Sequence, residues 1–200
     1  MDSGAHYWDG TTDTTRTVHL GGTATDFEKE MYTRVLMGNL DLQMATWDRR
    51  FGISGSNLDF LARRPLWEAG KNYGHGTGHG VGFFLNVHEG PQSISLRSTK
   101  TLAPGMIVSD EPGYYEDGKF GIRIEDLIVV KEDPDRKNFL YFENLTKFPY
   151  SRELIIPEML SPAQRAKVDA YHKQVLEEVS PLLEDNKRAL DYLRMRCQPL

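Results

Sequence analysis

The chain has 200 residues, 39% of them hydrophobic and 26% charged, which is typical of one soluble globular domain, with or without an appendage. A formal net charge of −5 without a basic run argues against nucleic acid as the main partner, and no apolar segment approaches the roughly 20 residues of a membrane span. The single cysteine, Cys197, excludes disulfides within the chain and cysteine-based zinc sites, so we expect a reducing, cytoplasmic location.

The N-terminal segment carries two acidic residues whose relative placement depends on a turn. Asp2 lies in a turn that no strand precedes, which indicates a piece of a longer protein. Residues 13–20 alternate and are rich in β-branched residues, so a strand with Asp13 on one face is predicted. A tight turn at Asp9-Gly10 would pair Asp2 with Thr17. The two carboxylates could then converge only through a wider or bulged connection.

Two helices are predicted in the next segment. Thr25 and Glu28 have the spacing of a capping box, and apolar residues at helical spacing continue the helix to near Trp47. Asn57 is expected to cap the second helix, which Gly70 ends. We expect the first helix to serve packing.

The stretch from Tyr73 to Pro91 combines alternating glycines with three of the six histidines of the chain. Glycine is favoured where the backbone passes close to other atoms, and imidazoles bind metals or transfer protons near neutral pH. A glycine-rich hairpin with incidental histidines is the alternative. A nucleotide-binding loop is disfavoured because no G-x-G-x-x-G spacing is completed.

Further acids follow in a predicted hairpin. Residues 106–111 form an apolar run that ends in two acids, and Pro112-Gly113 is expected to interrupt the strand ladder. Residues 120–130 form a later strand in which Arg123 and Glu125 share one face. This pattern indicates a polar site against an apolar core.

The C-terminal part is predicted to be helical. Ser161 and Gln164 occupy the N-cap and N3 positions of a helix that runs to about Val179, and Ser180-Pro181 begins another that reaches Arg196. These helices hold no cluster of reactive side chains, so packing or a subunit contact is their expected role.

Acids and histidines from distant segments are the candidate site residues. Carboxylates with one or two imidazoles suit Mn, Co, Zn or Fe(II), and a pair of divalent ions needs several carboxylates to offset their repulsion. Burying four carboxylates without cations would be costly. The candidates are Asp2, Asp13, His75, His79, His88, Glu111, Arg123 and Glu125.

Six motifs resemble, in the same order, those of the catalytic domain of Xaa-Pro aminopeptidases, which are pita-bread metallopeptidases. The resemblance covers nearly the whole chain. The motifs are Asp2-Ser-Gly, Asp13-Thr-Thr-Arg-Thr, His75-Gly-Thr-Gly-His79-Gly-Val-Gly, Asn86-Val-His88-Glu-Gly-Pro, Glu111-Pro-Gly-Tyr-Tyr and Gly121-Ile-Arg-Ile-Glu125-Asp.

The resemblance implies a ligand set for two divalent ions. Asp2 would bind one ion, and His79 and Glu111 would bind the other. Asp13 and Glu125 would bridge the two. Glu111 would also act as general base towards a water nucleophile. The family commonly uses Mn²⁺, although Zn²⁺ or Co²⁺ is possible.

The resemblance also implies roles for residues around the ions. His75 and His88 would hydrogen-bond the scissile carbonyl or the tetrahedral oxyanion. Tyr115 and Arg123 match residues that orient Asp2. The implied reaction releases the first residue from peptides with proline in second position.

The implied fold is α+β, with a curved, mostly antiparallel sheet covered by helices on its outer face. Residues 1–160 would form the catalytic domain, incomplete at its N-terminus, and 161–200 a helical extension packed on it. A homodimer is a further expectation. The alternatives are a prolidase-type dipeptidase, which shares all five ligands, and a pita-bread binding module without catalysis.

Overall fold

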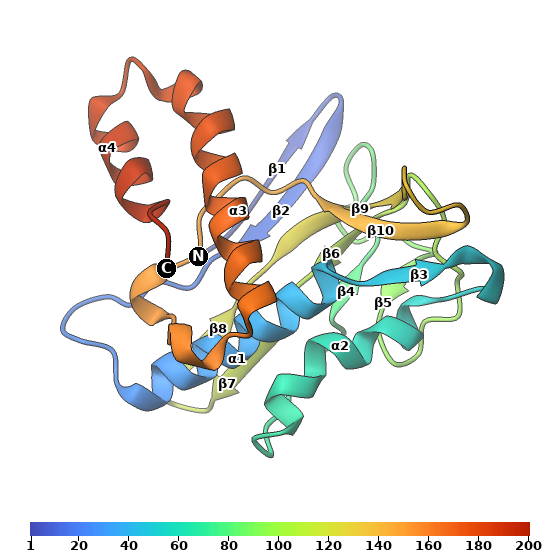
Figure 1. Ribbon diagram of the computed structural model, residues 1–200, viewed down its shortest axis with the longest axis horizontal. Helices are drawn as coiled ribbons and strands as arrows, with labels where there is room; N and C mark the ends of the chain where they lie inside the picture. Colours follow the sequence, from blue (N-terminus) through green and yellow to red (C-terminus); the bar gives the residue numbers. More distant parts are fainter. The chain divides into compact units, whose positions relative to one another are not determined.

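The computed structural model describes residues 1–200, which form four α-helices and ten strands (Figure 1). The predicted α+β class is confirmed. No helix combines the length and the hydropathy that crossing a membrane requires. The helices are α1 (Asp26–Gln43), α2 (Gly55–Trp67), α3 (Pro162–Val179) and α4 (Lys187–Arg196). The strands are β1 (Asp2–Tyr7), β2 (Gly10–Thr15), β3 (Thr46–Asp48), β4 (Gly78–His79), β5 (Ser93–Ile94), β6 (Ile107–Asp110), β7 (Gly113–Glu116), β8 (Phe120–Arg123), β9 (Asp126–Glu132) and β10 (Phe139–Asn144).

The chain divides into two compact units, and each has its own packing. Unit 1 comprises Met1–Thr17 and Arg34–Thr146, and unit 2 comprises Val18–Thr33 and Lys147–Leu200. The division of the chain into a catalytic part and a helical extension at residue 160 stays a prediction.

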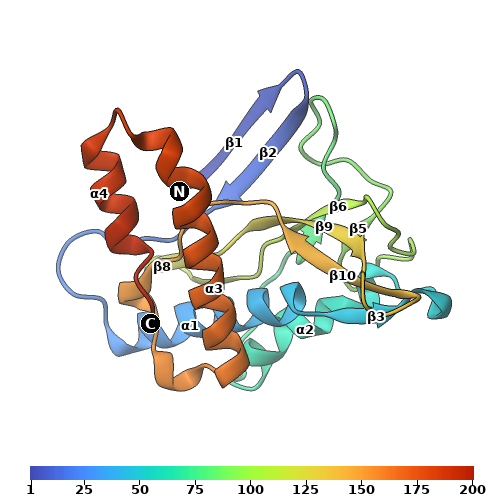
Figure 2. The ribbon, with the colours of Figure 1, turned by 45° about the horizontal axis from the view of Figure 1, so that its top comes forward.

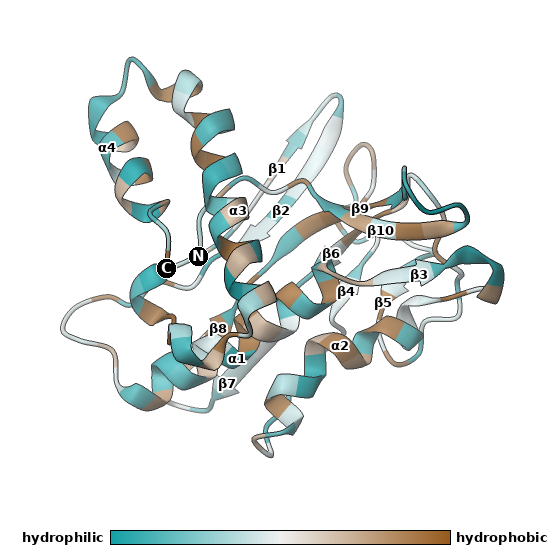
Figure 3. Cartoon of the chain, viewed as in Figure 1, coloured by the Kyte–Doolittle hydropathy of each residue, from teal (hydrophilic) through white to brown (hydrophobic).

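Unit 1 is built on a four-stranded antiparallel sheet in the order β3-β10-β9-β6. Hydrophobic residues, brown in Figure 3, run along β9, β10 and α2. The rings of Trp47 in β3 and Phe142 in β10 pack with centroids 4.9 Å apart. A Cβ at Gly55, the first residue of α2, would lie 1.8 Å from the carbonyl oxygen of Ser93. Only glycine therefore allows α2 to begin against the backbone of β5.

Three short antiparallel pairs complete unit 1, namely β1-β2, β4-β5 and β7-β8. Figure 2 shows the tip of the β1-β2 hairpin beside the loop that joins β4 to β5. Trp8 at the tip stacks on Phe84 of that loop, with centroids 5.6 Å apart and ring planes 7° from parallel. The Thr11 hydroxyl donates to the carbonyl oxygen of Leu85 at 3.1 Å. These contacts join the hairpin to the glycine-histidine stretch.

Unit 2 is organised around α3. The predicted capping box is confirmed, because the Ser161 hydroxyl accepts from the Gln164 N–H and the Gln164 side chain accepts from the Ser161 N–H. The α3 residue His172 is fully buried and its Nε2 accepts from the backbone N–H of Tyr150 at 3.1 Å. Tyr150 also packs on Tyr171, with centroids 4.8 Å apart. Aromatic packing thus fixes α3 to the segment before it.

The helix predicted between Thr25 and Trp47 is shorter than expected. Its capping box is confirmed, since Glu28 N–H donates to the Thr25 hydroxyl at 3.2 Å, but α1 ends at Gln43. Trp47 instead pairs with Leu140 in the sheet and is buried there. Packing in the core outweighs the helical spacing of the sequence.

Three other local predictions are wrong in detail. Ser54, not Asn57, is the N-cap of α2, and Asn57 occupies the N3 position of the capping box. The strand predicted over 13–20 ends at Thr15. The last helix is interrupted, because α4 begins only at Lys187, where Asn186 caps it by accepting from the N–H of Ala189.

Candidate metal site

The β1-β2 hairpin brings two predicted ligands to one face. Its turn lies at Trp8-Asp9, and its register pairs Asp2 with Thr15 and Gly4 with Asp13. Asp2 and Asp13 are therefore diagonal neighbours on the same face of the ladder. The expectation of a wider or bulged connection is wrong, because the turn lies one residue earlier than predicted.

Glu125 joins this pair through the backbone of Thr15. The N–H of Glu125 donates to the Thr15 carbonyl oxygen at 3.0 Å, and the Thr15 hydroxyl donates to Glu125 Oε2 at 2.6 Å. Glu125 is 2% exposed. Its carboxylate is thus held at the hairpin face and shielded from water.

His79 and Glu111 are joined by Ser109, a residue that sequence reasoning missed. The His79 N–H donates to Ser109 Oγ at 2.9 Å, and Ser109 Oγ donates to Glu111 Oε1 at 2.9 Å. A Cβ at Gly78 would lie 1.8 Å from the Ser109 carbonyl oxygen, so only glycine lets β4 cross β6 this closely. The signal for Ser109 in the sequence is its spacing of two residues from Glu111, because side chains at this spacing lie on the same face of a strand.

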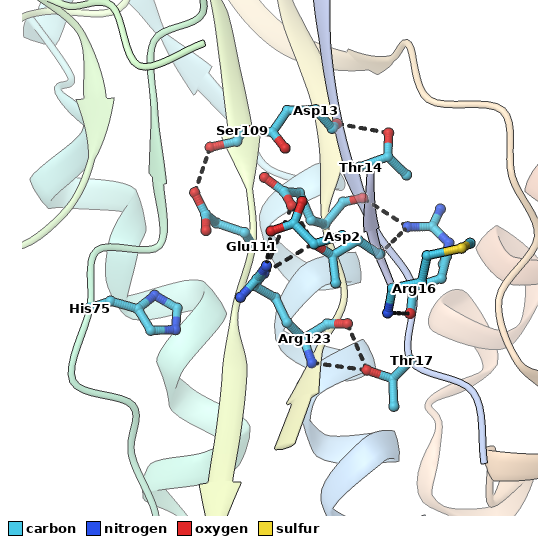
Figure 4. A network of polar contacts seen from close by, with 12 residues as sticks. Asp2, Asp13, Thr14, Arg16, Thr17, His75, Ser109, Glu111 and Arg123 are labelled. Atoms are coloured by element: carbon cyan, nitrogen blue, oxygen red, sulfur yellow. Dashed lines mark hydrogen bonds and ion pairs between the residues drawn. The ribbon is translucent and has the colours of Figure 1, made fainter. Parts of the chain in front are cut away.

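Ligand atoms from these segments form three overlapping groups, in each of which all atoms lie within 4.8 Å of one another. The groups are Asp2, Asp13 and Glu125; His79, Glu111 and Glu125; and Asp13, His79 and His88. Figure 4 shows Asp2 beside Arg123, and Glu111 with its carboxylate towards Ser109. The first two groups share Glu125, which is an arrangement that suits two neighbouring cations.

The charges of the site are unbalanced without cations. Burial, with the nearby carboxylate of Glu111, raises the pKa of Glu125 to about 8. Burial alone would lower the pKa of His79, but hydrogen bonds to Asp13 and Glu111 outweigh it and raise this pKa to about 10. Both groups therefore retain protons in order to offset clustered negative charge. Two divalent cations would supply that positive charge instead, so the donor set fits the predicted ions.

Arg123 lies against the acids at the edge of the site. Its guanidinium forms an ion pair with Asp2, and its Nε donates to the Thr15 hydroxyl at 3.0 Å. Its backbone N–H donates to the Thr17 hydroxyl, which donates in turn to the Arg123 carbonyl oxygen. The side chain is thus fixed at both ends beside the carboxylate that it contacts (Figure 4).

His75 and His88 line an open pocket of about 310 Å³. His75 is half-buried, with Nδ1 2.7 Å from the Gly76 carbonyl oxygen and Nε2 2.8 Å from the Tyr115 hydroxyl. His88 is exposed, and its ring lies edge-on to that of His79 at 4.1 Å. The pocket is lined by His75, Gly76, Gly78, His79, His88, Glu111 and Arg123. The structure therefore brings all nine predicted site residues into one region of unit 1.

Comparison with known proteins identifies the family. Residues 1–132 match metallopeptidase family M24, and residues 138–200 match the C-terminal region of the same family. A probable Xaa-Pro aminopeptidase P from Laccaria bicolor is 48% identical over the whole chain. The chain spans 32% of the length of that relative.

Solved structures agree in fold. The X-prolyl aminopeptidase of Caenorhabditis elegans, a cytosolic enzyme with a di-nuclear active site, matches the whole chain with a TM-score of 0.93 and 40% identity, and 33% of that protein is covered. The prolidase of Pyrococcus horikoshii matches 77% of the chain with a TM-score of 0.63 and 35% identity, and 40% of it is covered. The predicted pita-bread fold is confirmed, and the chain belongs to metallopeptidase family M24.

Proposed function

We propose that this chain forms the catalytic part of a dinuclear metalloaminopeptidase that releases the first residue from peptides with proline in second position. The observation that carries the proposal is the convergence of three ligand groups. Each pair of these groups shares one residue, which is Asp13, His79 or Glu125. Relatives that match the whole chain carry the name Xaa-Pro aminopeptidase, which supports the substrate class.

Five side chains would hold the ions. Asp2, Asp13 and Glu125 would hold one ion, and His79 and Glu111 the other, with Asp13 and Glu125 bridging. One imidazole among carboxylates suits a hard ion such as Mn²⁺ better than a soft one, with Zn²⁺ or Co²⁺ as alternatives. When bound, the ions supply a water nucleophile at neutral pH and stabilise developing negative charge.

The residues around the ions divide the remaining tasks. Glu111 accepts the proton of the attacking water, and the Ser109 hydroxyl, which donates to Glu111 Oε1, orients that carboxylate. His75 and His88 donate hydrogen bonds to the scissile carbonyl oxygen as it gains charge. Arg123 and Tyr115 orient Asp2, Arg123 through its ion pair with that carboxylate. The Tyr115 hydroxyl also lies 2.8 Å from His75 Nε2, so it orients that imidazole as well.

The substrate class follows from the chemistry of proline. An Xaa-Pro bond is a tertiary amide without an N–H, so a peptidase that hydrogen-bonds this group does not recognise it. A site for such bonds instead recognises the free amino terminus of the peptide and the proline ring.

A prolidase-type dipeptidase is the second candidate, because prolidases match about three quarters of the chain. Residues 138–200 favour the aminopeptidase, since an X-prolyl aminopeptidase structure covers the whole chain, this segment included. Hydrolysis of an Xaa-Pro-Xaa tripeptide and of an Xaa-Pro dipeptide, each with added Mn²⁺, distinguishes the two. We expect cleavage of the tripeptide, lost in Glu111→Gln. Cleavage of the dipeptide alone would establish the prolidase, and a metal-loaded protein that cleaves neither would support the binding module.

The location and assembly are part of the same proposal. A cytoplasmic location agrees with the single cysteine and with the cytosolic relative. A homodimer is expected to involve the C-terminal helices α3 and α4. Sedimentation that shows a monomer at high micromolar concentration would contradict the dimer.

A further inference from the structure

The segment that carries His75 is held by one side chain of α2. Residues 72–77 lie in neither a helix nor a strand, so the carbonyl groups of Tyr73 and His75 lie outside the strand ladders. Arg63 supplies hydrogen-bond donors instead. Its Nη1 donates to the Tyr73 carbonyl oxygen at 3.0 Å and to Asn72 Oδ1 at 3.1 Å, and its Nη2 donates to the His75 carbonyl oxygen at 2.7 Å. Its guanidinium also lies 4.1 Å from the centre of the Tyr73 ring.

Asp59, one turn earlier in α2, fixes this guanidinium. Asp59 Oδ2 accepts from Arg63 Nε at 2.6 Å, and Oδ1 accepts from the Thr77 hydroxyl at 2.6 Å. Asp59 is 0% exposed and Arg63 4% exposed. A buried ion pair adds little stability over a well-packed apolar pair, so stability alone does not explain it. The acceptors of the two Nη atoms of Arg63 all lie in the loop of residues 72–77, which indicates a role in fixing that loop.

The same network reaches the proposed general base. The Thr77 carbonyl oxygen accepts from the backbone N–H of Glu111 at 2.7 Å, and the Thr77 hydroxyl is the group that Asp59 holds. Arg63 thus fixes the backbone of His75 directly, and Asp59 holds Arg63 and, through Thr77, the backbone of Glu111. Neither side chain contacts the ligand groups described above.

We propose that Asp59 and Arg63 are positioning residues that place His75, and through Thr77 also Glu111, for the hydrolytic step. The inference rests on the proposed roles of His75 and Glu111. A displacement of about 1 Å at a reacting group can cost about a hundredfold in rate. The rigid guanidinium can bond several acceptors at once, whereas a lysine ammonium cannot reproduce its planar fork.

The kinetic test compares Arg63→Lys with the wild-type enzyme in the full protein that contains this chain. We expect kcat on an Xaa-Pro-Xaa tripeptide to fall about ten- to hundredfold with KM little changed, because His75 acts on the developing oxyanion. In a His75→Ala background, the same substitution should cost clearly less than in the wild type, and the remaining loss should be the part that acts on Glu111 through Thr77. Arg64→Lys is the matched control. Arg64 is the next residue of α2, is exposed, pairs with Asp41 and should leave kcat unchanged.

Amide hydrogen exchange provides a readout that needs no activity. In Arg63→Lys, exchange should accelerate at the N–H of Glu111 and across residues 74–79, while α2 stays protected. Thr77→Val, which removes only the hydroxyl that donates to Asp59, is the second variant if Arg63→Lys does not fold. A wild-type protein without peptidase activity would refute the proposed function, and the exchange measurement would still test the positioning. Unchanged exchange and kcat, or losses that add to that of His75→Ala, would overturn the inference.

Discussion

Removing the metal should make the stability of this protein fall as the pH rises. Glu125 has a pKa of about 8 in the folded chain, against 4.5 for a free glutamate, chiefly because it is buried. His79 has a pKa of about 10 against 6.5, because its bonds to Asp13 and Glu111 outweigh its burial. In both cases the folded state binds a proton more tightly than the unfolded state, so the stabilisation is complete at low pH and is lost towards high pH.

The magnitude follows from the overlap of the two titrations. Between about pH 6.5 and pH 8 each group contributes a loss of about 1.4 kcal/mol per pH unit, so the two together lower the free energy of unfolding by up to about 4 kcal/mol. For a chain of this size such a loss lowers Tm by on the order of 10 °C. Bound Mn²⁺ replaces the protons and should abolish most of this dependence, because metal binding strengthens as the ligands lose protons.

The assay is urea unfolding of chelator-treated protein at several pH values in this window, repeated with excess Mn²⁺. Glu125→Gln, which cannot ionise, should remove about half of the pH dependence in the metal-free protein. Glu143→Gln alters an exposed glutamate of β10 and should leave it unchanged. A metal-free protein whose stability rises from pH 6.5 to pH 8, or a slope that Glu125→Gln does not alter, would refute the reasoning.

Two substitutions test the contacts that hold His79 and Glu111 in place. Ser109→Ala leaves the His79 N–H without its acceptor, so we expect unfolding in urea to show a loss of about 1–3 kcal/mol, and kcat to fall because Glu111 loses its donor. A Ser109→Ala variant as stable as the wild type would argue against the role of Ser109 in joining His79 to Glu111. Gly78→Ala places a Cβ 1.8 Å from the Ser109 carbonyl oxygen and should separate β4 from β6, which elemental analysis would detect as reduced metal content. Unchanged metal content would contradict the close crossing.

Local signals in the sequence predicted the starts of two helices, α1 and α3, correctly. The capping boxes at Thr25 and Ser161 are present because each depends on residues three positions apart. Trp47 shows where such signals fail. Its spacing continues the helix, but its pairing with Leu140, far away in the chain, places it in a strand.

The candidate ligands were predicted more completely than the residues that hold them in place. Four of the five proposed ligands are acids next to or within apolar or β-branched segments, where acids are unusual, and the fifth, His79, lies in the glycine-histidine stretch. Their convergence depends on a hairpin register that shifts with a one-residue change in the turn, and composition could not settle that shift. Ser109 and Arg63 went unrecognised because their function depends on contacts between segments distant in sequence.

The central claim is that five side chains hold two divalent ions. Elemental analysis of protein equilibrated with Mn²⁺ and freed of excess ion tests it directly, with Asp13→Asn as the comparison because Asp13 is expected to bridge both ions. The account predicts close to two ions per chain in the wild type and a clear loss in Asp13→Asn. A folded wild-type protein that retains one ion or none, or an Asp13→Asn variant that still binds both, would contradict it.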